Sequence, residues 1–130
     1  MVSRSLVLFA LGSLLLAGCG HALPDFPDFD STTWRRDTYG CQNKRIPLLR
    51  VLEKHRDELY GARISEVDKL LGHPDEEELS EQSEKVYIYY ITAGPQCVAS
   101  HPRAAGPRLV LRFGATGMLT ETLYPVVPAQ

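Results

Sequence analysis

The sequence predicts an α+β domain in which two N-terminal helices pack on one face of a three-stranded antiparallel sheet. Apolar residues recur at helical spacing between residues 47 and 71, and at every second position from residue 86 onward. Upstream, a short apolar run ends at a cysteine. We therefore expect a signal peptide over residues 1–18, a modified cysteine and extended tether over 19–30, and one small domain over 31–130.

The N-terminal residues have the features of a bacterial lipoprotein signal. Arg4 precedes an apolar run of about eleven residues, too short to cross a bilayer because a spanning helix needs roughly 20. The run indicates an export signal, and Leu16-Ala17-Gly18-Cys19 matches a lipoprotein cleavage box. We expect cleavage between Gly18 and Cys19, with acyl chains such as palmitate on Cys19 holding the protein on a membrane. An ordinary secretory signal followed by an unrelated cysteine is the alternative.

The mature chain is small and mildly acidic. Residues 1–18 contain one basic residue, Arg4, so their removal leaves 112 residues with 13 Lys/Arg against 16 Asp/Glu, a net charge of -3. A chain of this length folds as one domain. Because it has no Lys/Arg cluster to neutralise a phosphate backbone, nucleic acid is not an expected partner.

Cys41 and Cys97 remain once Cys19 is assigned to lipid. In an oxidising periplasm an even pair of thiols most often forms a disulfide, so we expect Cys41 to pair with Cys97. Closing a loop of about 57 residues stabilises a fold by ~4 kcal/mol on the chain-entropy model. A redox or metal site is the alternative, but there is no Cys-x-x-Cys.

Residues 20–30 show neither helical nor strand periodicity. Pro24 and Pro27 favour an extended backbone, and ~10 extended residues can hold a domain about 30 Å from a bilayer. Phe26 and Phe29 are unusual in a linker, so we expect this tether to dock on its own domain, with docking on a partner as the alternative.

Three helical segments are predicted before the sheet. A short turn over residues 31–37 begins at Asp30 or Ser31 as N-cap. It carries Trp34, which we expect in the core, with a recognition anchor as the alternative. A longer amphipathic helix opens at Pro47. Its apolar face contains Leu48, Leu52, His55 and Leu59, and Gly61 ends it.

His55 lies on this apolar face, where a hydrogen-bonded structural histidine is the expected role rather than a catalytic one. The second of the two main helices runs from Ser65 to Leu71. Ser65 is its predicted cap, Asp68 its capping-box partner, and Gly72 and Pro74 end it. Residues 75–84 contain six acids, and we expect a solvated connection there, because the alternating Asp/Asn and central glycine of a calcium loop are missing.

The predicted strands cover residues 86–91, 109–113 and 118–124, with Gly114–Gly117 as the turn between the last two. Tyrosines are frequent in these strands, and exposed tyrosines suit recognition surfaces. The candidate interaction surface consists of Tyr87, Tyr89, Tyr90 and Tyr124. A half-buried strand face is the alternative. Residues 92–108 form a long loop that the disulfide would hold at Cys97, and long loops in compact domains often bind partners.

The order of these motifs resembles a known family. Ser65-x-Val67-x-x-Leu70-Leu71-Gly72-x-Pro74, then a Tyr-rich strand, then Leu-x-Leu-x-Phe-x-x-x-Gly, is similar to outer-membrane lipoproteins of the BamE (SmpA/OmlA) type. Their α-α-β-β-β domain is shared with the repeats of a β-lactamase-inhibitor protein. The resemblance covers roughly residues 48–124 and implies a non-catalytic adaptor in β-barrel assembly that binds protein partners and lipid headgroups. The disulfide, the long loop and the acidic connection are not part of the family pattern, and no partner-binding residue is carried over.

The sequence leads to a non-enzymatic, lipid-anchored lipoprotein of the bacterial cell envelope that acts as an interaction or adaptor module. The alternative is a periplasmic inhibitor or ligand-binding lipoprotein that uses the Tyr-rich sheet face. We expect no catalysis, cofactor or metal, because no nucleophile elbow, phosphate loop or His/Cys/Asp cluster is present and the four histidines lie in separate segments. Gly20, rather than Asp, after the lipidated cysteine favours the outer membrane over the inner one. We expect the domain to lie on the periplasmic face.

Overall fold

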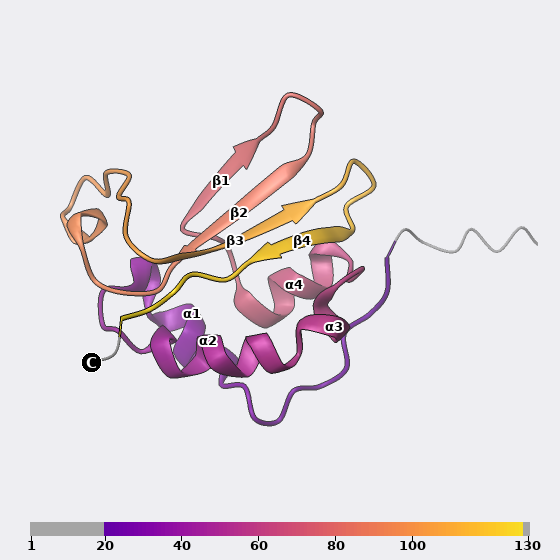
Figure 1. The fold of residues 1–130 in the computed structure, drawn as a ribbon, viewed down its shortest axis with the longest axis horizontal. Helices are drawn as coiled ribbons and strands as arrows, with labels where there is room; N and C mark the ends of the chain where they lie inside the picture. Colours follow the sequence, from indigo (N-terminus) through magenta and orange to yellow (C-terminus); the bar gives the residue numbers. More distant parts are fainter. Residues whose placement is uncertain (1–19, 129–130) are drawn as a thin grey trace, which may run out of the picture.

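The computed structural model describes residues 20–128, which form an α+β fold with a helical layer beneath a four-stranded antiparallel sheet (Figure 1). The α-helices of this part of the chain are α1 (Ser31–Arg36), α2 (Arg45–Lys54), α3 (Arg56–Leu59) and α4 (Ile64–Leu71). The strands are β1 (Glu76–Leu79), β2 (Lys85–Tyr90), β3 (Arg108–Phe113) and β4 (Leu119–Leu123), and two short 3-10 turns, η1 (Thr38–Gly40) and η2 (Pro95–Cys97), accompany them.

The sheet has the order β1-β2-β3-β4, with every neighbouring pair antiparallel. The three predicted strands correspond to β2, β3 and β4, but the prediction of a three-stranded sheet was wrong because it omitted β1. The residues Glu76, Glu77 and Glu78 read as a solvated connection, and β1 has no apolar alternation from which to detect it. It forms because backbone pairing with β2 is supplemented by cations, Arg103 on Glu76 and Glu78 and Lys85 on Glu77.

The helices start and stop partly where the sequence predicts. Asp30 caps α1, its carboxylate accepting from the backbone N–H of Thr33 at 3.0 Å. The helix predicted from Pro47 to Leu59 is interrupted at His55 and divides into α2 and α3. The short α1 corresponds to the turn predicted over residues 31–37. The helical layer therefore contains four helices, whereas the predicted fold class packed two on the sheet.

Helix α4 begins one residue earlier than predicted, and Ser65 is not its cap. The cap position is Arg63, without a side-chain hydrogen bond, and the Ile64 N–H instead donates to the carbonyl of Gly117 at 2.9 Å. The β3–β4 turn thus satisfies a donor that a capping side chain would otherwise satisfy. The C-terminal end agrees with the prediction, because Gly72 adopts the positive φ of 71° that ends the helix.

The core lies between the helices and the inner face of the sheet. Trp34 is fully buried, as predicted, and packs near Tyr89 and Phe29. The residues of the core include Leu49, Leu52, Leu59, Val67, Leu71, Leu109, Leu111, Phe113 and Leu119. Leu52 and Leu59 of the predicted apolar face are buried as expected, but on α2 Leu49 takes the buried position expected of Leu48, which is only partly buried.

Residues 20–30, here called the N-terminal strap, run along the side of the helices opposite the sheet (Figure 1). Phe26 and Phe29 are buried and belong to the core. Docking of this segment on its own domain is therefore confirmed, and the extended tether predicted to hold the domain about 30 Å from a bilayer was wrong for these residues. Burial of the two phenylalanines, together with the hydrogen bonds of His21 and of Asp28, favours the docked strap over a free linker.

Candidate functional site

The predicted tyrosine surface is largely buried, so it is not an exposed recognition face. Tyr87, Tyr89 and Tyr90 are 4%, 0% and 0% exposed, and only Tyr124 is partly accessible. Tyr87 and Tyr89 point into the core, because alternate residues of β2 lie on the inner face of the sheet. Tyr90 points to the outer face but lies beneath the long loop, whose Ala104 N–H donates to the Tyr90 hydroxyl at 3.1 Å.

The tyrosine hydroxyls have internal acceptors. That of Tyr89 donates to the carbonyl of Gly72 at 2.8 Å, that of Tyr90 to Glu76 at 2.7 Å, and that of Tyr124 to the carbonyl of Leu52 at 3.3 Å. Burial raises the pKa of Tyr87 and Tyr89 and raises that of Tyr124 to about 12. These side chains therefore stay neutral and structural at physiological pH.

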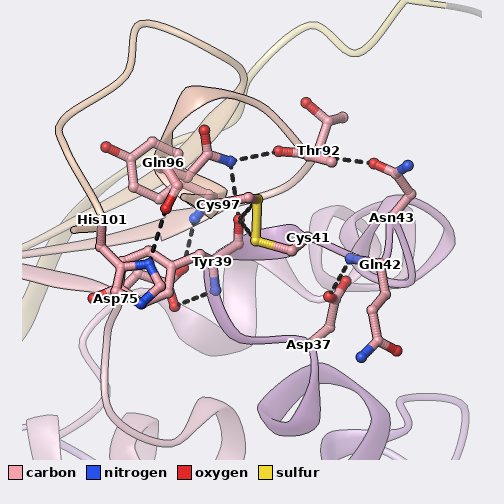
Figure 2. Close-up of a disulfide and its surroundings, with 12 residues drawn as sticks. Asp37, Tyr39, Cys41, Gln42, Asn43, Asp75, Thr92, Gln96, Cys97 and His101 are labelled. Carbon is pink, nitrogen blue, oxygen red and sulfur yellow. Dashed lines mark hydrogen bonds between the residues drawn. A yellow bond between two sulfur atoms is a disulfide. The ribbon is translucent and has the colours of Figure 1, made fainter. Parts of the chain in front are cut away.

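The long loop, residues 92–107, is held firmly at one end of the molecule. Cys97 forms the predicted disulfide with Cys41, and Figure 2 shows the polar side chains that surround it. The buried Gln96 donates from Nε2 to the carbonyls of Thr92 and Tyr39 at 2.7 and 3.0 Å. His101 stacks on Tyr39 with ring centroids 4.0 Å apart. We call residues 92–107 the distal loop, because Figure 1 places this orange loop at the end of the molecule opposite the indigo segment with which the described chain begins.

Below the distal loop, Arg45 and Asp75 form a buried ion pair that the sequence did not reveal. Their side chains are 1% and 4% exposed, and Arg45 Nη1 lies 2.6 Å from Asp75 Oδ2. Arg45 also donates to the carbonyls of Trp34 and Tyr90, and its guanidinium lies over the Trp34 ring. The carboxylate of Asp75 accepts from the N–H groups of Tyr39 and Tyr90. Through these contacts the ion pair links α1, η1, α2 and β2, so its role is structural.

The N-terminal strap is attached by backbone and side-chain contacts along its length. The His21 N–H donates to the carbonyl of Gly61 at 2.9 Å, and the Arg63 N–H donates back to His21 at 3.0 Å. Further along, Phe26 stacks on His55 with ring centroids 4.1 Å apart. His55 Nε2 lies 2.9 Å from Asp28, and the hydrogen bond to this carboxylate raises the pKa of His55. His55 is therefore a structural histidine that holds the strap.

A hollow of about 300 Å³ lies between the strap and α4. Its walls include Leu23, Pro24 and Pro27 from the strap and Glu66, Lys69 and Leu70 from the helix. Two of its charges already pair with each other, Lys69 Nζ lying 3.2 Å from Glu66 Oε1. The hollow thus lies along the contact between the docked strap and α4.

The outer face of the sheet carries ion pairs that cover buried apolar side chains. Arg112 lies 3.2 Å from Glu121, and Arg103 bridges Glu76 and Glu78 across β1. Val86 and Ile88 lie beneath them and are buried. The charges of these side chains are therefore paired within the domain.

The predicted export and lipidation residues, Arg4 through Gly18 and Cys19, lie outside the described residues, which begin at Gly20. Within residues 20–128, no group of three or more His, Cys, Asp and Glu side chains is arranged to hold a metal ion. In the same part of the chain, none of the helices has the length and apolar character needed to cross a membrane.

Comparison of the chain with protein-family models, with curated proteins and with solved structures finds no match. The similarity to the BamE type therefore stays a prediction from the sequence motifs.

Proposed function

We propose that this protein is a non-enzymatic lipoprotein of the bacterial cell envelope, held by Cys19 in the outer membrane on its periplasmic face, where it acts as a protein-interaction or adaptor module. The observation that carries the proposal is the division of its three cysteines. Cys41 and Cys97 are joined within the domain, while Cys19 stands at the end of the cleavage box. A disulfide suits an exported protein, and the box supplies the reason for export.

The interacting part of this adaptor is the distal loop. It lies at the opposite end from residue 20 in Figure 1, so a membrane anchor at Cys19 leaves it pointing away from the bilayer. Val98 is 56% exposed on it, next to the disulfide. A loop already ordered by a disulfide, the buried Gln96 and the stacked His101 loses little conformational entropy on binding.

The motif resemblance favours β-barrel assembly as the process served, with protein partners rather than nucleic acid. The alternative of an inhibitor that uses a tyrosine-rich sheet face has lost its support, because three of the four tyrosines are buried. Catalysis is not proposed, since three of the four described histidines, His21, His55 and His101, are engaged in strap and loop contacts, and the exposed His73 follows α4 in a separate segment.

Photo-crosslinking in cells tests the adaptor function. A photoreactive amino acid at Val98 is compared with one at Glu81, an exposed position on the β1–β2 turn. We expect Val98 to capture a barrel-assembly component that Glu81 does not capture. Equal yields at both positions, or capture of one soluble enzyme instead, would contradict the proposal.

A further inference from the structure

The N-terminal strap determines how close the domain sits to its anchor. The described chain begins at Gly20, and consecutive Cα atoms are about 3.8 Å apart, so Cys19 is one peptide unit from a residue that is already docked. Gly20 has a φ of 94°, and a Cβ at this position would meet Arg63 Cγ and the Gly61 carbonyl oxygen at 2.9 Å. Gly20, the residue that follows the proposed anchor in the sequence, therefore lies tightly against the domain surface.

The surface around this point is defined here as the anchor-side corner, consisting of Gly20, His21, Tyr60, Gly61, Arg63 and the β3–β4 turn, residues 114–118. Its parts are joined by backbone hydrogen bonds. The Gly61 N–H donates to Leu119 at 2.8 Å, the Ile64 N–H donates to Gly117 at 2.9 Å, and Arg63 forms an isolated bridge with Met118. The corner is thus one connected surface rather than a set of separate loops.

The chemistry of the anchor-side corner suits the headgroup region of a bilayer. Tyr60 is 64% exposed, whereas Tyr87, Tyr89 and Tyr90 are buried. Tyrosine is enriched at membrane–water interfaces, and arginine can keep its charge among headgroups while its stem contacts apolar atoms. The turn Gly114-Ala115-Thr116-Gly117-Met118 carries no charge. The acid nearest Arg63, Glu66, is also paired with Lys69.

We propose that the anchor-side corner lies directly on the bilayer surface, with Tyr60 in the headgroup region, because the docked strap places the acylated Cys19 against it. This inference rests on the proposed lipidation of Cys19. It adds an orientation: the strap acts as a rigid mount, and the domain does not swing on a flexible tether. The distal loop then projects away from the membrane.

Depth-dependent quenching tests this orientation. The mature protein is purified from membranes and reconstituted in phosphatidylethanolamine and phosphatidylglycerol vesicles whose acyl chains carry bromine near the headgroup. Tyr60→Trp is compared with the matched control Val98→Trp, exposed on the distal loop, and the emission of the buried Trp34 is subtracted using the unmutated protein. We expect a loss of emission several-fold larger at Tyr60→Trp than at Val98→Trp.

A third variant separates the mount from the anchor. A flexible Gly/Ser linker inserted between Cys19 and Gly20 should leave the protein on the vesicles but reduce quenching at Tyr60→Trp to the level of Val98→Trp. Protein that floats with vesicles yet shows equal quenching at both positions would overturn the orientation while leaving the anchor intact. Unchanged quenching after the linker insertion would overturn the mounting role of the strap. Protein that lacks the acyl group and does not float would instead overturn the proposed function, and this inference with it.

Discussion

At the scale of single residues, the buried pair of Arg45 and Asp75 sets the geometry beneath the distal loop. Each charge is almost fully buried, and each also has backbone partners, so the desolvation cost is offset by several hydrogen bonds. Removing one member leaves the other charged and buried. The arrangement is therefore intolerant of single substitutions.

We predict that Asp75→Asn lowers the free energy of unfolding by about 3–5 kcal/mol, the usual cost of breaking a buried pair. The matched control is Lys85→Met, which removes an exposed pair with Glu77 and should cost less than about 1 kcal/mol. Urea denaturation measures both. Equal losses for the two variants would show that Arg45 does not depend on Asp75.

The pair of His55 and Asp28 gives the strap a pH dependence. The hydrogen bond between them raises the pKa of His55 above 6.5 and lowers the pKa of Asp28 below 3.8. The stabilisation from His55 is thus complete below pH 6.5 and is lost as pH rises through the raised pKa of the folded protein. The stabilisation from Asp28 is complete above its unfolded value and is lost as pH falls through its lowered pKa.

We predict that Asp28→Asn moves the NMR titration midpoint of His55 down toward 6.5, the ordinary histidine value. His21 is an internal control, because its raised pKa comes from the carbonyls of Ala22 and Tyr60 and should not respond to this substitution. A His55 midpoint that does not move would mean that Asp28 does not hold it.

At the scale of elements, periodicity identified β2, β3, β4 and the two main helices because each has an apolar face of the right period. It missed β1, whose Glu76, Glu77 and Glu78 pair with β2 through the backbone and are neutralised by Lys85 on that strand and by the more distant Arg103. The start of α4 was misplaced for a similar reason, since its donor is satisfied by Gly117, more than fifty residues away in the sequence. Long-range partners of this kind leave no local pattern.

In the candidate site, too, the features with a local sequence signal were predicted and those that depend on long-range contacts were not. Counting cysteines was sufficient to predict Cys41–Cys97, whereas the burial of Tyr90 depends on the distal loop folding over it. Phe26 and Phe29 were the signal for strap docking, but their contacts with His55 and Trp34 could not be read from spacing.

The disulfide is expected to stabilise the fold mainly by restricting the unfolded chain. We predict that the double variant Cys41→Ser with Cys97→Ser loses about 4 kcal/mol of unfolding free energy, because the disulfide joins residues 56 positions apart in the sequence. The unmutated protein measured with and without reductant is the control. A double variant as stable as the oxidised protein would contradict a structural disulfide.

The strap is expected to behave as part of the domain. We predict that Phe29→Ala costs about 3–5 kcal/mol, as for other buried aromatic truncations, whereas Pro27→Ala, at an exposed strap position, should cost far less. Chemical denaturation of both variants provides the comparison. Similar unfolding free energies for the two variants would show that the strap behaves as a free linker and not as part of the domain.

At the scale of the whole molecule, the fold separates two ends. The strap fixes residue 20 at one end, and the disulfide fixes the distal loop at the other (Figure 1). The helices and sheet between them form a continuous core, so an anchor at one end orients the loop at the other. This polarity suits the proposed envelope adaptor, provided that Cys19 is the attachment point as proposed.

The mass of the N-terminal peptide of protein extracted from the membrane fraction tests that attachment most directly. We predict a chain that begins at Cys19 and carries a diacylglyceryl group on sulfur, together with release of the Cys19→Ser variant into the soluble fraction. A chain that begins elsewhere, an unmodified Cys19, or a Cys19→Ser variant that stays with the membrane would contradict it.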